Sequence, residues 1–195
     1  MSRISELIQE LCPDGVEYIK LKTLIDKQII INVKAPVKLK KENYKLSGKY
    51  PIIDQGQNYI VGFSDDDSSL VPKGLYVIFG DHTENFKFAD FPFIQGADGI
   101  KILRTTRQFL DTRYFYYALE SYYLKTGGYT RHYSFLMDTS IPIPPLEIQE
   151  EIVKILDNFT QLEAELEAEL EARKKQYEYY RNKLLSFEGK DVEWK

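Results

Sequence analysis

The chain has 195 residues, of which 43% are hydrophobic and 14% aromatic, and its formal net charge is −4. These values are typical of a folded, soluble protein with one or two domains. The single cysteine, Cys12, excludes an internal disulfide framework and fits a reducing compartment. No segment reaches the about 18 consecutive apolar residues of a membrane span. Residues 1–15 lack the apolar core of a signal peptide, so we expect a cytoplasmic protein without a membrane partner.

The charge is unevenly distributed along the chain. Residues 18–140 hold 17 Lys and Arg against 13 Asp and Glu, a net of +4, whereas residues 146–187 hold 6 against 10, a net of −4. A mildly basic globular part beside an acidic segment is compatible with nucleic-acid binding, but a surplus of this size does not establish it.

The first elements are short. Apolar residues at positions 4, 7, 8 and 11 have helical spacing, and the turn at residues 13–15 (Pro-Asp-Gly) ends this helix. Residues 18–25 are amphipathic and lead into a β-branched strand at residues 29–33. Six lysines then lie between positions 34 and 49. This segment suits either a solvated surface loop or a loop that contacts phosphates.

Short aromatic or β-branched segments follow, separated by Gly, Asp, Ser or Pro, at residues 50–54, 59–63, 75–79, 86–88 and 100–104. Strands of this length and spacing predict a compact, mainly antiparallel β domain. The run Asp-Asp-Asp-Ser-Ser at residues 65–69 lacks the alternating ligand spacing and the glycine of a calcium loop, so we predict a polar turn there.

Two further helices are predicted. Asp111 is placed to cap a helix at residues 112–124, which the glycine pair at residues 127–128 ends. An extended, proline-rich segment at residues 141–145 then leads to residues 146–187, which contain no Pro or Gly. As one helix this segment is about 63 Å long. Its own domain is too small to cover so long an apolar face, so we expect a partner helix.

The apolar positions of this long helix follow steps of three and four. Two consecutive steps of four separate Leu162, Leu166 and Leu170, which interrupts a regular heptad. We expect alanines at spacing four to lie beside these leucines and to let the partner helix approach closely, whereas the five glutamates between positions 163 and 171 form a solvated face. The expected dimer interface consists of Phe159, Leu162, Ala164, Leu166, Ala168, Leu170, Ala172, Tyr177, Tyr180 and Leu184.

Signatures of catalysis and of metal binding are missing from the sequence. It has no Gly-rich phosphate loop, no nucleophile elbow and no paired-histidine helix. The two histidines, His82 and His132, are 50 residues apart, and Cys12 is the only other candidate for a soft metal ligand. The segment Asp-His-Thr-Glu at residues 81–84 could supply an acid and a base, but a polar loop explains it equally well. We therefore predict no catalytic residue, no metal ligand and no bound cofactor.

Two segments carry side chains suited to DNA bases. Residues 55–58 (Gln-Gly-Gln-Asn) place amides around a glycine in a loop between strands, and amide side chains bond adenine edges bidentately. Near the glycine pair at residues 127–128, Arg131 supplies a guanidinium that can read guanine, beside His132 and two tyrosines.

The alternative for this second segment is structural. In that case Tyr129, Tyr133 and Phe135 belong to the core, and Arg131 makes an ion pair within the protein. Taken together on one small basic domain, the two segments favour DNA binding.

A set of motifs is shared with one known family. They are Tyr-Pro-Ile at 50–52, Gln-Gly-Gln at 55–57, Gly-Asp-His-Thr at 80–83, Gly-Tyr-Thr-Arg-His-Tyr at 128–133, Ile-Pro-Ile-Pro-Pro-Leu-Glu-Ile-Gln at 141–149 and Ile-Val-Lys-Ile-Leu-Asp at 152–157. Together these segments resemble the specificity subunits of type I restriction-modification systems. In that family such a proline-rich strand leads into a long helix with a Gln near its start.

The resemblance also concerns the length of the chain. A full specificity subunit has two target recognition domains and two long helices that pair antiparallel as a spacer, whereas this chain carries one of each. Residues 191–195 (Asp-Val-Glu-Trp-Lys) repeat the pattern at residues 15–20, where the first domain begins. The resemblance therefore implies a half-length form of the subunit.

We accordingly expect an α+β fold with a compact, mainly antiparallel β target recognition domain and a few helices at residues 1–145, one long coiled-coil-forming helix at 146–187 and a tail at 188–195. The resemblance implies a non-catalytic subunit that reads one half of a bipartite site on double-stranded DNA and forms a homodimer through the helix. It would direct a methyltransferase and a restriction endonuclease. S-adenosylmethionine, ATP and Mg²⁺ would then be bound by those partners.

Loop residues are the expected DNA contacts. For bases or their surroundings we select Gln55, Gln57, Asn58, His82, Thr83, Arg131 and His132, and for phosphates Lys38, Lys40 and Lys41. Two other classes of function stay open. One is a dimeric coiled-coil module that binds proteins and not DNA, and the other is a nuclease with a scattered Asp and Lys site. DNA retention and metal-dependent DNA cleavage distinguish them.

Overall fold

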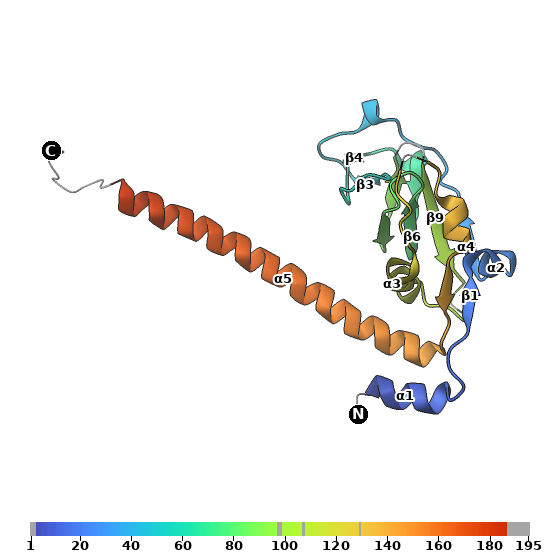
Figure 1. Cartoon of the computed structure of the whole chain (residues 1–195). Helices are drawn as coiled ribbons and strands as arrows, with labels where there is room; N and C mark the ends of the chain where they lie inside the picture. The colour runs from blue at the N-terminus through green and yellow to red at the C-terminus, as the bar shows by residue number, and fades with distance from the viewer. Residues whose placement is uncertain (1–2, 97–98, 107, 129, 187–195) are drawn as a thin grey trace. The chain divides into compact units, whose positions relative to one another are not determined.

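The computed structural model describes residues 3–96, 99–106, 108–128 and 130–186, and it has the predicted α+β fold (Figure 1). The chain divides into two compact units, Met1–Val153 and Lys154–Lys195. The first unit holds the described strands, and the second holds most of the long helix. The expected tail at 188–195 lies outside the described residues, as do Tyr129, Phe187 and the repeat at 191–195. Within the described ranges, no helix combines the length and apolar character needed to cross a membrane.

The helices largely follow the predictions. They are α1 (Arg3–Leu11), α2 (Leu21–Asp26), α3 (Thr112–Tyr122), α4 (Tyr133–Asp138) and α5 (Leu146–Leu185), with two short 3₁₀ helices, η1 (Lys41–Asn43) and η2 (Asp67–Ser69). The predicted first helix is confirmed as α1, and α3 and α5 begin where predicted. The amphipathic segment at residues 18–25 is divided between a strand and α2. Helix α4 was not predicted, because its six residues are too few to show a helical period.

The strands form three sheets. They are β1 (Tyr18–Lys20), β2 (Ile30–Val33), β3 (Tyr50–Ile53), β4 (Gly62–Ser64), β5 (Leu70–Val71), β6 (Tyr76–Gly80), β7 (Phe86–Ala89), β8 (Phe93–Gln95), β9 (Ile100–Thr105) and β10 (Ser140–Pro142). Two sheets have four strands, in the orders β2-β9-β6-β7 and β4-β3-β8-β5, and β1 pairs with β10. The pairs are antiparallel except for β3 with β8, so the prediction of a mainly antiparallel domain is confirmed.

Strand β6 shows where the core lies. All five of its residues are buried because both faces of its sheet are covered. Val77 and Phe79 pack in a cluster with side chains of α2, α3 and α4. Tyr76 and Ile78, on the opposite face, pack against residues of β3, β5 and β8 in the other four-stranded sheet. The turn at residues 81–84 leaves this doubly covered sheet at the Gly80 end of β6.

Some predicted boundaries are wrong. The strand expected at residues 59–63 forms only at Gly62–Ser64. Tyr59 lies in the bend before it, and its hydroxyl donates to the carbonyl of Phe88. Strands β5 and β8 were not predicted because they have only two and three residues. Helix α3 is capped by Asp111 as predicted, with hydrogen bonds of 2.8 and 2.9 Å to the next amides. It ends at Tyr122, before the glycine pair, and buries Tyr123.

Gln149 fixes the start of α5 to the first unit. Its side chain is fully buried. The amide nitrogen donates to the carbonyls of Phe109 (2.9 Å) and Pro144 (2.7 Å), and the amide oxygen accepts from the backbone nitrogen of Asp111 (2.9 Å). This residue therefore holds the segment before α3 and the proline-rich segment before α5 together.

In the second unit, the alanines of α5 do not lie beside the leucines as expected. Phe159, Leu162, Leu166 and Leu170 line an apolar groove of about 640 Å³ together with two glutamates of α5, not with alanines. In a regular helix each residue turns about 100°, so Ala164, two positions from Leu162 and from Leu166, lies on the opposite face. The same holds for Ala168 and, in part, for Ala172. These alanines therefore cannot share one two-helix interface with the leucines.

Candidate nucleic-acid interface

Three loops far apart in the sequence meet beside the end of β6. They are the loop after β3 at residues 55–58, the turn after β6 at residues 81–84 and the loop after α3 at residues 126–132. The backbone nitrogen of His82 donates to Oε1 of Gln55 (3.3 Å), and Oγ1 of Thr83 donates to the carbonyl of Gln55 (2.5 Å). Nδ1 of His82 lies 2.9 Å from the carbonyl of Thr130. The predicted base-contacting segments are therefore neighbours in the folded domain.

Asp81 joins the turn to the third loop. Its backbone oxygen accepts from the nitrogen of His132 (2.8 Å), and its Oδ1 accepts from the nitrogen of Tyr133 (2.8 Å), the first residue of α4. Its own nitrogen donates to the carbonyl of Gly99 (2.7 Å). The side chain is buried, with 6% of its surface exposed. Asp81 is therefore a structural residue that sets the start of α4, and this supports the polar-loop explanation of residues 81–84 over acid–base chemistry.

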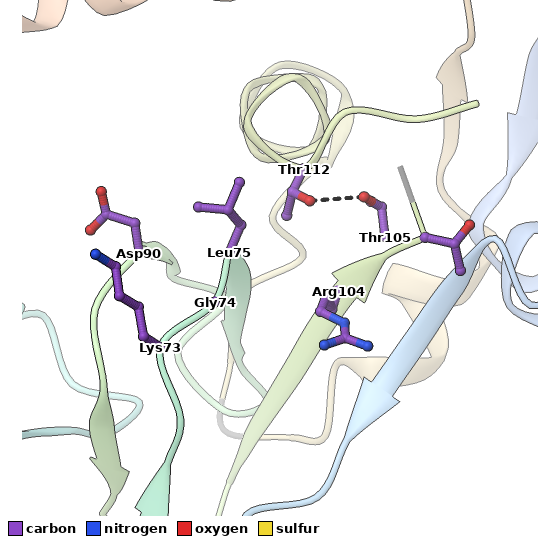
Figure 2. A pocket seen from close by; sticks show the side chains of 8 residues that line it. Lys73, Gly74, Leu75, Asp90, Arg104, Thr105 and Thr112 are labelled. Atoms are coloured by element: carbon purple, nitrogen blue, oxygen red, sulfur yellow. Dashed lines mark hydrogen bonds between the residues drawn. The ribbon is translucent and has the colours of Figure 1, made fainter. Parts of the chain in front are cut away.

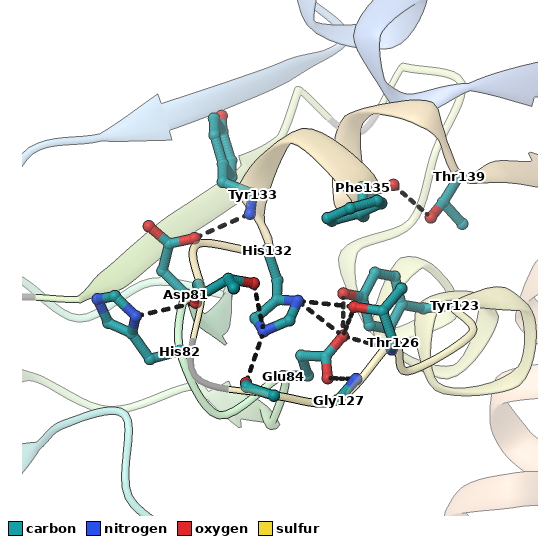
Figure 3. Close-up of polar contacts among 12 residues, drawn as sticks. Asp81, His82, Glu84, Tyr123, Thr126, Gly127, His132, Tyr133, Phe135 and Thr139 are labelled. Atoms are coloured by element: carbon teal, nitrogen blue, oxygen red, sulfur yellow. Dashed lines mark hydrogen bonds and ion pairs between the residues drawn. The ribbon is translucent and has the colours of Figure 1, made fainter.

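Glu84 is the centre of a buried polar cluster (Figure 3). Its Oε1 accepts from the hydroxyl of Tyr123 (2.7 Å) and from the nitrogen and hydroxyl of Thr126 (2.8 and 3.0 Å), and its Oε2 accepts from the nitrogen of Gly127 (2.8 Å). Burial alone would raise the pKa of this carboxyl, but the hydrogen bonds from Thr126, Tyr123 and Gly127 lower the pKa from 4.5 to about 2. Glu84 is therefore held as a carboxylate.

His132 was expected near DNA bases, and its position corrects that expectation. The ring is completely buried. Nδ1 lies 3.2 Å from Oε1 of Glu84 and 2.8 Å from the hydroxyl of Thr126, and Nε2 faces the carbonyl of Gly128 at 3.2 Å. Because a carbonyl only accepts, Nε2 donates there. His132 closes the loop against the domain, and its ring has no exposed surface with which to touch a base.

Lys87 holds the first loop in a similar way. Only 5% of this residue is exposed, and Nζ donates to the carbonyls of Asp54 (2.8 Å) and Asn58 (2.6 Å). Burial lowers the pKa of Lys87, and the nearby charge of Asp54 opposes this effect. The sequence analysis did not select Glu84, Lys87 or Tyr123. The sequence offered no signal for Lys87, because its alternation with Phe86 and Phe88 is the pattern of a half-exposed strand with a solvated lysine.

The other selected residues present side chains to solvent. Gln57, Asn58, Thr83 and Arg131 are exposed, and Gln55 and His82 are partly exposed. Arg131 thus lies on the surface, while its neighbour His132 is buried. Phe135 is also exposed, so the alternative in which it belongs to the core is wrong.

The lysine-rich segment is attached to the same part of the domain. Its Leu39 donates to the carbonyl of Gln95 at the end of β8 (2.9 Å), and Gly96 donates to Ile53 at the end of β3 (2.8 Å), two residues before Gln55. Lys38, Lys40 and Lys41 are exposed around this attachment. The phosphate-contact candidates therefore lie on the segment attached beside the first loop.

Two other lysines of this segment have a structural role. Lys45 pairs with Asp65 and Lys49 with Asp67, each at 2.8 Å. Asp66 accepts from the nitrogen of Ser68 (3.0 Å) and caps η2, which confirms the predicted turn. Within the described ranges, no group of three or more His, Cys, Asp or Glu side chains is placed to hold a metal ion.

Two hollows lie at opposite ends of β6. The one beside the loops has a volume of about 420 Å³ and includes Gln57, Lys87 and Tyr123 in its lining. The other, of about 570 Å³, lies where β6 begins and β9 ends (Figure 2). There the hydroxyls of Thr105 and Thr112 are 2.8 Å apart. Of the candidate DNA contacts, Gln57 lines the first hollow and none lines the second.

Comparisons with known proteins agree on one family. Residues 13–172 match the family described as "Type I restriction modification DNA specificity domain". The EcoR124I/EcoR124II specificity subunit of Escherichia coli is 34% identical over 172 residues, which are 80% of this chain and 42% of that protein. The S subunit of a type I restriction-modification system from M. genitalium has a TM-score of 0.63 at 20% identity, covering 90% of this chain and 48% of that one.

A third similar protein is a chain from a structure concerned with complex assembly and conformational transition of the type I restriction-modification system. It has a TM-score of 0.61 at 18% identity and covers 94% of this chain and 50% of that one. These structural likenesses show the fold. The chain spans about half or less of the length of these relatives. Since the family match covers most of the chain, the protein belongs to the family of type I restriction-modification DNA specificity proteins.

Proposed function

We propose that this chain is a non-catalytic DNA-recognition subunit whose first unit reads one half of a bipartite DNA site. The observation that carries the proposal is that two loops with exposed base-bonding groups are both bonded to His82, one through Gln55 and the other through Thr130. The first loop exposes the amides of Gln57 and Asn58, and the second exposes the guanidinium of Arg131. Such groups bond adenine and guanine edges in the major groove. The exposed lysines next to the first loop supply phosphate contacts that carry affinity but not sequence preference.

The test is a selection from random double-stranded oligonucleotides, with the full chain alone and with the methyltransferase subunit of its system. We expect the retained DNA to share a short motif. Retention without any motif, or no retention in either arrangement, contradicts the proposal. The second result favours the protein-interaction module. DNA cleavage by the chain alone in Mg²⁺ indicates a nuclease instead.

We also propose that two copies of the chain pair through α5. Leu166 is 64% exposed, Tyr177 66% and Leu184 69%, and an apolar stripe of this kind is stable in water when another helix covers it. The stripe consists of Phe159, Leu162, Leu166, Leu170, Tyr177, Tyr180 and Leu184.

Charge favours the antiparallel arrangement. Residues 146–167 hold seven acidic residues and one basic residue, a net of −6, whereas residues 168–185 hold three acidic and five basic residues, a net of +2. Antiparallel pairing places each acidic half against a basic half, and parallel pairing places like charges together. A two-fold symmetric dimer would present its two recognition domains to inverted half-sites at a separation set by the helix.

A single engineered cysteine tests the direction of pairing. In a Cys12→Ser background, Leu184→Cys puts one thiol near the end of each helix. We expect no disulfide between copies after mild oxidation, because antiparallel helices keep these ends far apart. Efficient crosslinking of Leu184→Cys would show parallel pairing. A mixture with Phe159→Cys, near the opposite end of the stripe, gives heterodimer crosslinks only if the helices are antiparallel.

The chemistry of the system is assigned to partner subunits. We propose that a methyltransferase using S-adenosylmethionine and an endonuclease using ATP and Mg²⁺ assemble with this chain. Sequencing of methylated sites in DNA treated with the chain and its methyltransferase tests this. A palindromic motif with a gap of fixed length is expected from a symmetric dimer, and an asymmetric motif would contradict it.

A further inference from the structure

The hairpin of β6 and β7 carries two buried charges of opposite sign, three positions apart. Glu84 is 4% exposed and Lys87 is 5% exposed. A buried charge destabilises a domain unless hydrogen bonds replace its water, so charges in such positions need a reason. Here each charge is solvated by backbone groups of a different loop. Glu84 meets the amides of the loop at residues 126–132, and Lys87 meets carbonyls of the loop at residues 55–58.

Lys87 closes the first loop at its two ends. Its ammonium group bonds the carbonyl of Asp54 and the carbonyl of Asn58, which bracket Gln55 and Gln57. The carboxylate of Asp54 accepts from the nitrogen of Gly56 (2.7 Å), so the turn between these carbonyls is fixed from inside as well. An apolar side chain would suffice to fill this position between Phe86 and Phe88. The ammonium adds a constraint on the loop.

Glu84 does the same for the loop that carries Arg131. Its two oxygens accept from successive amides at the start of that loop, and His132 binds the same carboxylate from the other end (Figure 3). The backbone of Glu84 has φ +55°, in the left-handed region that side chains other than glycine rarely adopt. A glycine would relieve this strain but would lose the carboxylate. The carboxylate, rather than an unstrained backbone, is therefore what this position requires.

We propose that Glu84 and Lys87 are positioning residues for DNA sequence recognition, each holding one of the two base-reading loops. This inference depends on the proposed function, because it assigns a cause to the sequence preference of that site. Both anchors belong to one hairpin but hold different loops. Loss of one anchor therefore loosens one loop and leaves the other in place.

The test uses two near-isosteric substitutions in the full chain. Glu84→Gln keeps one acceptor oxygen but turns an NH₂ group toward an amide that needs an acceptor, and Lys87→Met removes the donors to both carbonyls. The bound DNA is sequenced after selection from random duplexes, as for the unchanged chain. We expect each variant to reduce base preference about tenfold at its own one or two motif positions, which differ between the variants. Total retention of random duplex should change less than threefold.

Glu120→Gln and Lys125→Met are matched controls. Glu120 and Lys125 are exposed and line the hollow that Lys87 also lines. Their substitutions change the net charge by the same amounts as Glu84→Gln and Lys87→Met. We expect them to leave the motif unchanged at every position. Flattening of all positions together by Glu84→Gln or Lys87→Met would indicate general destabilisation and overturn the inference, as would a motif identical to that of the unchanged chain. If the unchanged chain itself selects no motif, the proposed function fails before the inference is reached.

A measurement on the unmodified chain covers the case in which a variant does not fold. By NMR we expect the amides of Thr126 and Gly127, in an exposed loop, to exchange at least 100-fold more slowly than those of Gln57 and Asn58. We also expect the Nζ protons of Lys87 to be visible, unlike those of solvated lysines such as Lys40. Fast exchange of the Thr126 and Gly127 amides overturns the role of Glu84, and an unobservable Nζ signal overturns that of Lys87.

Discussion

The two units of this chain differ in which side chains they bury and which they expose to water. In the first unit, buried polar side chains are hydrogen-bonded: Gln149 makes three such bonds, and among the described residues no buried side-chain nitrogen or oxygen lacks a partner. In the second unit, leucines and tyrosines are exposed along the helix, and Leu166 has 64% of its surface in water. The first unit satisfies its buried polar groups within the chain, whereas the second exposes an apolar stripe, as the proposed pairing through α5 requires.

The difference agrees with the proposed division of functions, in which the first unit reads DNA and the second pairs. A surface that reads bases must keep its geometry without DNA, and the proposed role of Glu84, which accepts from the amides of Thr126 and Gly127, is to hold one of its loops in this way. A helix that pairs needs only a continuous apolar stripe and suitable charges. Substitutions that exchange these properties therefore have distinct consequences for the two units.

The largest effect is expected from a charge in the middle of the stripe. Leu166→Glu places a carboxylate where the two helices meet, and it acts twice in a symmetric dimer. Losing two buried leucines removes about 3–6 kcal/mol, so the dimer dissociation constant should rise at least about 100-fold. Analytical ultracentrifugation measures this. Asn182→Glu, which adds the same charge on the opposite face of α5, should leave the dimer intact. Equal weakening by both would argue against the leucine stripe as the interface.

The next effect concerns the anchor of α5 in the first unit. Gln149→Ala leaves the amide of Asp111 and the carbonyls of Phe109 and Pro144 without a partner. Unfolding of the first unit should become easier by about 3 kcal/mol, since each unsatisfied buried group contributes about 1–3 kcal/mol before relaxation. Denaturant titration measures the change. Gln161→Ala removes the same side chain from an exposed position of the same helix and should change stability by less than about 0.5 kcal/mol.

A smaller effect depends on pH. The pKa of Glu84 falls from 4.5 to about 2 on folding, so its carboxylate stabilises the folded state fully above pH 4.5 and progressively loses that contribution as the pH falls toward 2. Glu84→Gln has no such titration. The melting temperature of the unchanged chain should therefore exceed that of Glu84→Gln near neutral pH, and the difference should narrow between pH 4.5 and 2. A difference that stays constant over this range would show that Glu84 is not held as a carboxylate.

The sequence alone was enough to predict elements with a long periodic pattern or with a residue that marks their start. The start of α5 follows Pro144 and Pro145, and the start of α3 follows Asp111, because these residues act on their immediate neighbours. Strand β8 was missed because its three residues depend on pairing with β3 and β5, more than 20 residues away in each case. A contact of that range leaves no periodic signal in the strand itself.

The candidate site was predictable in its parts but not in its organisation. Amides in a loop between strands indicated Gln57 and Asn58, and a guanidinium after the glycine pair indicated Arg131; these residues are exposed on neighbouring loops. His132 was predicted to contact bases because of its residue type. That prediction is wrong, because the ring is buried beside the carboxylate of Glu84. Residue types show what a side chain can bond. Only the folded structure shows whether that side chain is already hydrogen-bonded within the protein.

The smallest expected effects separate affinity from sequence preference. Lys40→Ala removes one exposed charge, so binding to every duplex should weaken about three- to tenfold, and the slope of log K against log salt should fall by about 0.9. Arg131→Ala should instead relax preference at one motif position, by about 1–3 kcal/mol, with little change in binding to unrelated duplexes. Titrations of a selected duplex and a scrambled duplex at three salt concentrations measure both quantities. Because Lys40 and Arg131 each carry one positive charge, equal effects of the two substitutions on both duplexes would mean that the loop at residues 126–132 contributes charge rather than base recognition.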